Sequence, residues 1–180
     1  MKEVNIIKAL TFIEPGPVVL VTTFDEQKQN VMTISWTMPI DWEGGIALTT
    51  GPWNYSFQAL MKTKECVIAI PPAEILEKVI QIGDISGEKT DKFSLFNLTP
   101  LPAKTVQAPL IQECMACLEC EMTDYIEKYG IFIFKANRVL INENCLDKRM
   151  IHALGDGTFI IDGEKKDCRS LMADKLPPDL

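Results

Sequence analysis

Two short stretches of the sequence carry residue types that could bind a flat, phosphorylated ligand. A two-residue alternation of polar and apolar side chains is typical of a β-strand with unlike faces, one offering hydroxyl groups and the other an apolar wall. Pro39 lacks a backbone N–H and should end the strand, which is how the rim of a pocket is often made. The pattern equally fits a half-buried strand whose hydroxyl groups face water. The alternation of polar and apolar side chains occurs in Val31–Ile40, where Thr33, Ser35 and Thr37 alternate with Ile34, Trp36 and Met38.

The second stretch, Gly51–Ser56, has the composition of a turn that leads into a helix. The apolar residues after it recur at helical spacing and predict a helix over Tyr55–Lys62, with Asn54 as its N-cap. A helix N-terminus presents unpaired backbone N–H groups, and the hydroxyl groups of Tyr55 and Ser56 add donors. A phosphate fits such a place, although a capped helix without a ligand has the same sequence.

The cysteines include a C-x-x-C-x-x-C run, which suggests a metal or iron–sulfur site. The segment Met115–Met122 is predicted to be a strand, where Cys114 and Cys120 would share a face and Cys117 would point the other way. One metal ion could not then reach all three thiols. The other cysteines are scattered: Cys66, Cys145 and Cys168. We therefore expect free thiols and no metal site, and keep a cysteine-based metal-binding redox protein as an alternative.

The composition of the 180 residues limits the classes of partner. With 47% hydrophobic and 24% charged residues, we expect one domain, 1–180, with a core of its own. The formal net charge of -7 gives no electrostatic footprint for nucleic acid or for an anionic membrane surface. No apolar run approaches the ~20 residues that span a bilayer, and the N-terminus has no signal-peptide hydrophobic region. We expect a cytoplasmic protein that binds neither nucleic acid nor membrane.

Around these stretches the sequence predicts many short strands and few helices. Helices are predicted over 1–13, Tyr55–Lys62 and Glu74–Ile82. Because closure removes exposed strand edges, the set favours a closed, largely antiparallel barrel with helical excursions, and no G-x-G-x-x-G unit supports a Rossmann fold. The predicted strands are Val18–Phe24, Val31–Ile40, Ile46–Thr50, Glu65–Ile70, Met115–Met122, Ile131–Ile141 and Thr158–Asp162.

A long loop, Ile85–Phe93, follows the predicted helix Glu74–Ile82 and contains Ser86, Lys89 and Lys92. Long loops in compact domains often bind ligands. The two lysines also fit a solvated surface pair, so both interpretations remain open from the residues alone.

Six sequence motifs, considered together and in their order along the chain, resemble those of a known family. They are Val31–Ile40, Asn54–Ser56, Ser86–Gly87 with Asp91–Phe93, Leu98–Pro100, Ala108–Cys114 and Leu118–Cys120. Together they resemble the flavin reductase-like family with an FMN-binding split barrel, particularly its flavoredoxin branch, from about residue 15 to 163. The resemblance implies a mainly β fold with helices, an antiparallel, Greek-key-like split β-barrel. It also implies a homodimer that holds FMN without a covalent bond near the subunit interface.

The resemblance further implies where the flavin lies. The isoalloxazine ring would contact the strand segment Thr33, Ile34, Ser35, Trp36, Thr37 and Met38, whose hydroxyl and backbone N–H groups would bind its heteroatoms. The phosphate would contact Asn54, Tyr55 and Ser56. Lys92 would supply the counter-charge, and Ser86 and Lys89 would belong to a supporting loop.

An FMN site implies an oxidoreductase, because the flavin itself exchanges hydride or electrons. The protein would be a flavin reductase that uses NADH or NADPH, or a flavoredoxin-like carrier that works with a redox protein partner. No side-chain acid or base is required, so we name no catalytic residue, and the lone His152 fits a structural role. A flavin- or ligand-binding module without turnover is the alternative from a different class.

Overall fold

The computed structural model describes residues 1–6, 16–172 and 175–177. Its strands are β1 (Lys2–Val4), β2 (Val19–Phe24), β3 (Gln29–Ile34), β4 (Thr37–Pro39), β5 (Gly45–Thr49), β6 (Glu65–Ile70), β7 (Pro100–Leu101), β8 (Leu110–Ile111), β9 (Ala116–Ile126), β10 (Ile131–Ile141), β11 (Ile151–Ala153) and β12 (Phe159–Ile161). Its helices are α2 (Ser56–Thr63), α3 (Leu76–Asp84), α4 (Lys92–Leu95) and the 3-10 turns η2 (Ala73–Ile75), η3 (Glu127–Tyr129) and η4 (Arg169–Leu171). None of the helices in these ranges is long and apolar enough to cross a bilayer.

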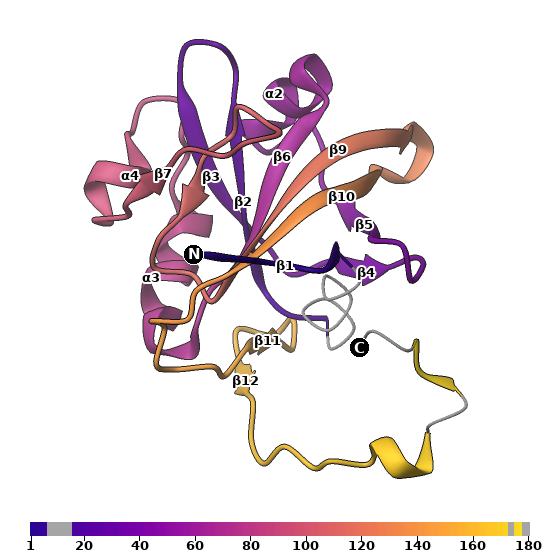
Figure 1. Cartoon of the computed structure of the whole chain (residues 1–180). Coiled ribbons are helices and arrows are strands. Elements are labelled where there is room, and N and C mark those ends of the chain that lie inside the picture. Colours follow the sequence, from indigo (N-terminus) through magenta and orange to yellow (C-terminus); the bar gives the residue numbers. More distant parts are fainter. Residues whose placement is uncertain (7–15, 173–174, 178–180) are drawn as a thin grey trace.

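One antiparallel sheet dominates the fold, in the order β3-β2-β6-β9-β10-β5-β4, with β1 added beside β10. Its two end strands, β3 and β4, are separated in sequence only by Ser35 and Trp36. The sheet must therefore curl until its ends come close together (Figure 1). In the part of the chain that is described, no hydrogen-bonded ladder joins β3 to β4. The prediction of a mainly β split barrel is confirmed. The prediction that the barrel is fully closed is wrong.

Both faces of the central strands are buried, which explains their continuous apolar sequences. In β2, Val19 and Val21 lie in the cluster inside the curled sheet. Leu20, between them, lies in a second cluster that includes Ile82 of α3 and Phe93 of α4. The helices α3 and α4 therefore cover the outer face of the sheet, on the left in Figure 1.

Most predicted strands are found, and β6 and β10 have the predicted bounds. The helix predicted over 1–13 is wrong at its start, because Lys2–Val4 pairs with the edge of β10 at Val139–Ile141 as strand β1. Residues 7–13 lie outside the described residues. The short elements that the sequence did not predict include α4, β7, β8, β11, η3 and η4.

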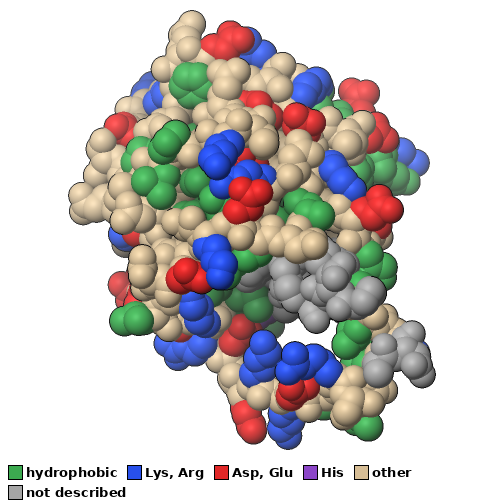
Figure 2. Space-filling model, in the orientation of Figure 1, with side chains coloured by type: hydrophobic (Ala, Val, Ile, Leu, Met, Phe, Trp, Pro, Cys, Tyr) green, Lys and Arg blue, Asp and Glu red, His purple; other side chains and the backbone are tan. Residues whose placement is uncertain are grey.

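After β12 the chain leaves the body of the fold. The segment 163–172 is exposed along its whole length and runs away from the sheet (Figure 1). In the space-filling view it forms a separate arm at the lower right (Figure 2). Leu171 of η4 is 85% exposed on this arm, which leaves it without a packing surface in the described part of its own chain.

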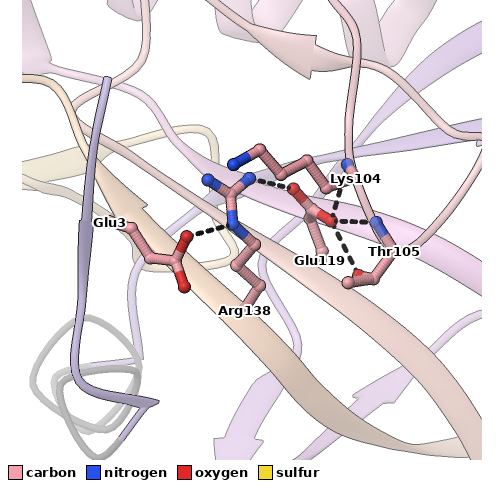
Figure 3. A network of polar contacts seen from close by, with 5 residues as sticks. All are labelled: Glu3, Lys104, Thr105, Glu119 and Arg138. Atoms are coloured by element: carbon pink, nitrogen blue, oxygen red, sulfur yellow. Dashed lines mark hydrogen bonds and ion pairs between the residues drawn. The ribbon is translucent and has the colours of Figure 1, made fainter.

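A buried ion pair fixes the loop before β8 to the sheet. Glu119 in β9 is fully buried, and its carboxylate accepts hydrogen bonds from the Arg138 guanidinium at 2.7 Å and from the Lys104 and Thr105 N–H groups. Arg138 also binds Glu3 of β1 at 2.6 Å (Figure 3). Burial by itself would raise the pKa of Glu119, but these hydrogen bonds outweigh it and the pKa is lowered.

Candidate functional site

A cleft of about 400 Å³ opens at the N-terminus of α2, beside the turn that joins β2 to β3. Its lining is rich in hydrogen-bonding and cationic side chains, unlike the apolar core behind it. These polar residues include Thr23, Lys28, Asn30, Tyr55, Ser56 and Lys62. The cleft therefore suits a polar or anionic group more than an apolar one.

Three buried polar side chains form the inner wall of the cleft. Ser56 Oγ accepts hydrogen bonds from Thr23 Oγ1 at 3.1 Å and from Asn30 Nδ2 at 2.9 Å. A hydroxyl oxygen that accepts two such bonds still carries its own proton to donate. Asn30 is only 4% exposed, and its Oδ1 has no hydrogen-bond partner within the described ranges. A hydroxyl proton and an unmatched carbonyl oxygen thus lie side by side, both buried behind the surface of the cleft.

The fold brings these three residues together in two ways. Thr23 and Asn30 are directly opposite each other in the β2–β3 ladder, so their side chains lie on the same face. Ser56 opens α2, which is fixed to the sheet by the edge-to-face contact of Phe57 with Phe132 at 5.8 Å between ring centroids. Sequence reasoning missed Thr23 and Asn30 because it began the second strand at Val31, whereas β3 begins at Gln29 and pairs Asn30 with Thr23.

Two lysines bring positive charge to the cleft. The Lys28 ammonium donates to the Gly87 and Glu88 carbonyl oxygens, and the Lys62 ammonium pairs with Glu26 at 2.7 Å. The first turn of α2 contains no acidic residue, so the positive end of the helix dipole is not neutralised there. Asp25 stays ionised nearby, because the Lys28 backbone N–H binds its carboxylate and lowers its pKa.

The helix at the cleft begins at Ser56, one residue later than the predicted start at Tyr55. Tyr55 is the N-cap of α2 and makes no side-chain capping hydrogen bond. The Asn54 side chain instead donates to Thr50 Oγ1 at 2.9 Å, so the prediction of Asn54 as N-cap is wrong. Asn54, Tyr55 and Ser56 nevertheless all line the cleft, and α2 presents its first turn without a side-chain cap.

The segment Val31–Ile40 is not one strand. It breaks after Ile34, and Ser35 and Trp36 lie between β3 and β4. Thr33 Oγ1 donates to the Val79 carbonyl of α3 at 2.6 Å, so this hydroxyl group serves packing against the helix. The prediction of one ten-residue strand with hydroxyl groups along one face is therefore wrong. The chain turns at Ser35 and Trp36 to reach the other end of the sheet.

The predicted apolar wall faces outward. Trp36 is 70% exposed and Met38 is 58% exposed, whereas Ile34 is buried inside the curled sheet. Ser35 is also exposed, and Thr37 Oγ1 makes a 3.4 Å hydrogen bond to the Pro17 carbonyl. An apolar surface therefore exists next to the end of β3, but it is open to whatever approaches the molecule.

The loop predicted to support the ligand has two different parts. Lys92 is buried, and its ammonium donates to the Val31 carbonyl at 2.9 Å and to the Ile82 carbonyl at 2.8 Å. Burial lowers the pKa of Lys92 to about 8. It joins α4 to β3 and α3, so the interpretation of Lys92 as a surface lysine is wrong. Ser86 and Lys89 are exposed, and Ser86 Oγ accepts from the Glu88 N–H at 3.2 Å.

The cysteine run is divided between the two apolar clusters. Cys114 lies in the turn before β9 and packs in the same outer cluster as Cys117, while Cys120 lies in the inner cluster. The prediction that Cys114 and Cys120 share a strand face is therefore wrong. In the described ranges no group of His, Cys, Asp and Glu side chains is arranged to hold a metal ion. His152 Nε2 lies 2.8 Å from Asp162 Oδ1 across the β11–β12 hairpin.

Comparison with known proteins gives consistent results. The sequence model of the flavin reductase like domain matches residues 13–156. The YddH protein of Escherichia coli is 27% identical over 176 residues, which cover 87% of this chain and 92% of that protein. An FMN-binding domain of a flavin reductases-like enzyme from Shewanella baltica superposes with a TM-score of 0.83 at 20% identity, covering 92% and 95% of the two chains. Flavoredoxin of Desulfovibrio vulgaris superposes with a TM-score of 0.76 at 24% identity, covering 84% and 89%.

Proposed function

Because this chain belongs to the flavin reductase-like family, we propose that it is an FMN-dependent oxidoreductase whose cleft at the start of α2 binds the phosphate end of the flavin. FMN, when bound, supplies the redox chemistry, accepting a hydride and releasing electrons singly or in pairs. The protein then has to bind the flavin, orient its ring and control what reaches it.

The unmatched Asn30 Oδ1 is the observation that carries this proposal. A buried carbonyl oxygen without a partner costs about 1–3 kcal/mol, so native structures seldom leave one unless a ligand or water supplies the donor. The hydroxyl groups of a ribityl chain are such donors, and the Ser56 hydroxyl beside Asn30 can donate in return. The inner wall of the cleft therefore fits the polyol and phosphate part of FMN.

The phosphate itself finds its donors nearer the cleft mouth. The uncapped first turn of α2 provides backbone N–H groups, and Asn54 and Tyr55 add side-chain donors. We assign to Lys28 and Lys62 the counter-charge that the family resemblance implied for Lys92, because both lysines line the cleft. Lys92 holds the backbone of β3 through the Val31 carbonyl instead.

The isoalloxazine ring is proposed to lie against the break between β3 and β4. Ser35 and Trp36 lie outside both strands there, and we propose that their backbone N–H groups bind the ring heteroatoms. Trp36 and Met38 expose apolar surface next to the break, which a flat aromatic ring would cover. Donors facing the pyrimidine edge would stabilise the negative charge of the reduced ring. Ser86 and Lys89 stay in the proposed supporting loop.

Two versions of this function differ in the electron donor, which is either a redox protein or a nicotinamide nucleotide. The acidic chain, with its net charge of -7, and the lack of a nicotinamide-binding fingerprint favour a redox protein as the partner, as in a flavoredoxin-like carrier. Anaerobic addition of NADH or NADPH to the FMN-loaded protein tests this. A flavin spectrum that persists with both nucleotides and bleaches with dithionite is expected of a carrier, whereas rapid bleaching by one nucleotide would assign a reductase instead.

The same exposed surface supports a homodimer. Trp36, Met38, Ile40 and Trp42 are each at least 46% exposed along and beyond β4, which is an end strand of the sheet. The exposed arm 163–172, with Leu171 and Met172, also lacks a surface to pack on in the described part of its own chain. We propose that a second copy covers these surfaces and encloses the flavin ring between the subunits.

A further inference from the structure

Lys28 connects the cleft, which it lines, to the 86–88 turn. It stands on the turn between β2 and β3, and its ammonium donates hydrogen bonds across to the carbonyl oxygens of Gly87 at 2.5 Å and Glu88 at 3.3 Å. The ring of Tyr55 lies 5.7 Å from the same ammonium. Lys28 therefore holds the 86–88 turn, which follows α3, against the wall of the cleft.

The turn held by Lys28 lies directly over Asn30. A Cβ atom added to Gly87 would stand 2.1 Å from Asn30 Oδ1, so the glycine backbone packs against the amide with no room for a side chain. Gly87 is itself buried. The position of this turn thus restricts the rotamer of Asn30, and with it the direction of the unmatched carbonyl oxygen.

We propose that Lys28 is a positioning residue for the flavin site: its ammonium holds the 86–88 turn over Asn30 and thereby sets how fast FMN enters and leaves the cleft. The inference rests on the proposed function for the identity of the ligand. It gives Lys28 a role beyond charge, because an ammonium bound to two carbonyl oxygens fixes the backbone as well as the local potential.

Lys62 provides a matched control. It lines the same cleft and carries the same charge, but its ammonium donates to the Asp25 carbonyl at 3.1 Å and pairs with Glu26 at 2.7 Å. Both partners lie on the β2–β3 turn, so Lys62 makes no connection to the 86–88 turn through them. Replacing either lysine by methionine removes one positive charge and keeps an unbranched side chain.

The experiment combines two readouts on the full chain. Hydrogen exchange of the peptide covering residues 85–91 is followed by mass spectrometry in the FMN-free protein, and FMN association and dissociation are followed by flavin fluorescence in stopped flow. In Lys28→Met we expect exchange in this peptide and FMN dissociation to rise about tenfold, a factor equivalent to about 1.4 kcal/mol. Lys62→Met is expected to slow FMN association while exchange in the peptide stays as in the wild type.

Two results would overturn the assignment. Unchanged exchange of the 85–91 peptide in Lys28→Met would mean that the lysine does not hold the turn. Equal changes in FMN dissociation for the two variants would mean that Lys28 acts only through its charge. If the wild-type chain binds no FMN, the proposed function fails, and the exchange data on the FMN-free protein still decide whether Lys28 positions the turn.

Discussion

Asn30 Nδ2 donates a 2.9 Å hydrogen bond to Ser56 Oγ, which ties strand β3 to the first residue of helix α2. The bond fixes the amide so that its other atom, Oδ1, has no partner among the residues that the structure describes. A buried amide that uses only one of its two polar atoms keeps an acceptor for a ligand or a water molecule. The proposed flavin site depends on this pair of side chains.

Replacing Asn30 by alanine should weaken FMN binding. The variant loses the acceptor for a ribityl hydroxyl group and also the orientation of Ser56, so we expect the Kd to rise about tenfold or more, for about 1–2 kcal/mol lost. Isothermal titration calorimetry with FMN measures this change. Asn144→Ala, at an exposed asparagine in the loop after β10, is the control and should leave the Kd unchanged. An unaltered Kd in Asn30→Ala would place the flavin elsewhere.

A methyl group at position 87 should act through Asn30. The added Cβ would stand 2.1 Å from Asn30 Oδ1, so the amide must move to accommodate it. We expect Gly87→Ala to raise the Kd for FMN by a factor similar to that of Asn30→Ala. A double-mutant cycle checks the mechanism, since the combined variant should bind no more weakly than either single variant. Additive losses would show that the two positions act independently.

Lys92 should make stability rise with pH in an alkaline window. Its pKa is about 8 in the folded protein because burial disfavours the charge, whereas the ordinary value is 10.5. Between these values the unfolded chain binds more protons, so this group adds stability as pH rises from about 8 to 10.5, by at most about 1.4 kcal/mol per pH unit. Urea unfolding of wild type and Lys92→Met across this window isolates the contribution, which is absent from the variant. Parallel pH profiles would contradict it.

Glu119 should contribute to stability above acidic pH. Its pKa is lowered in the fold by hydrogen bonds from Thr105 and Arg138 that outweigh its burial, so its stabilisation is present above about pH 4.5 and is lost as pH falls through the lowered value. Glu119→Gln should cost about 3 kcal/mol at pH 7, because it leaves Arg138 without its buried partner. Thermal unfolding from pH 7 to 3 should show this difference shrinking. Glu121→Gln, exposed on the same strand, should behave as wild type.

The apolar surface at β4 should control assembly. We expect sedimentation to give about twice the 20.2 kDa of one chain for the wild type, and a single-chain mass for the double variant Trp36→Lys, Met38→Lys. A charged side chain at each position would have to be desolvated in the dimer interface. Leu146→Lys, at a 93% exposed leucine after β10, should stay dimeric. A wild-type chain that sediments as a monomer would contradict the proposed dimer.

The strands were predictable from sequence where burial on both faces makes them continuous apolar runs, as in β6 and β10. The break at Ser35–Trp36 was not predictable from sequence. The alternation of polar and apolar residues continues through it, and it does not encode the turn that a curled sheet needs. The buried position of Lys92 was not predictable either, because its acceptors, the Val31 and Ile82 carbonyls, belong to two other elements, β3 and α3. Asn54–Ser56, which the family resemblance assigned to the phosphate, line the cleft. Thr23 and Asn30 become visible only through the hairpin register.

The most direct measurement is a titration of the purified chain with FMN and, separately, with riboflavin, followed by flavin fluorescence and visible absorption. A cleft with Lys28, Lys62 and the α2 N-terminus predicts one FMN per chain, with quenched fluorescence, and riboflavin binding at least about tenfold weaker because it lacks the phosphate. Failure to bind FMN, or riboflavin binding as tight as FMN binding, would contradict the assignment of this cleft.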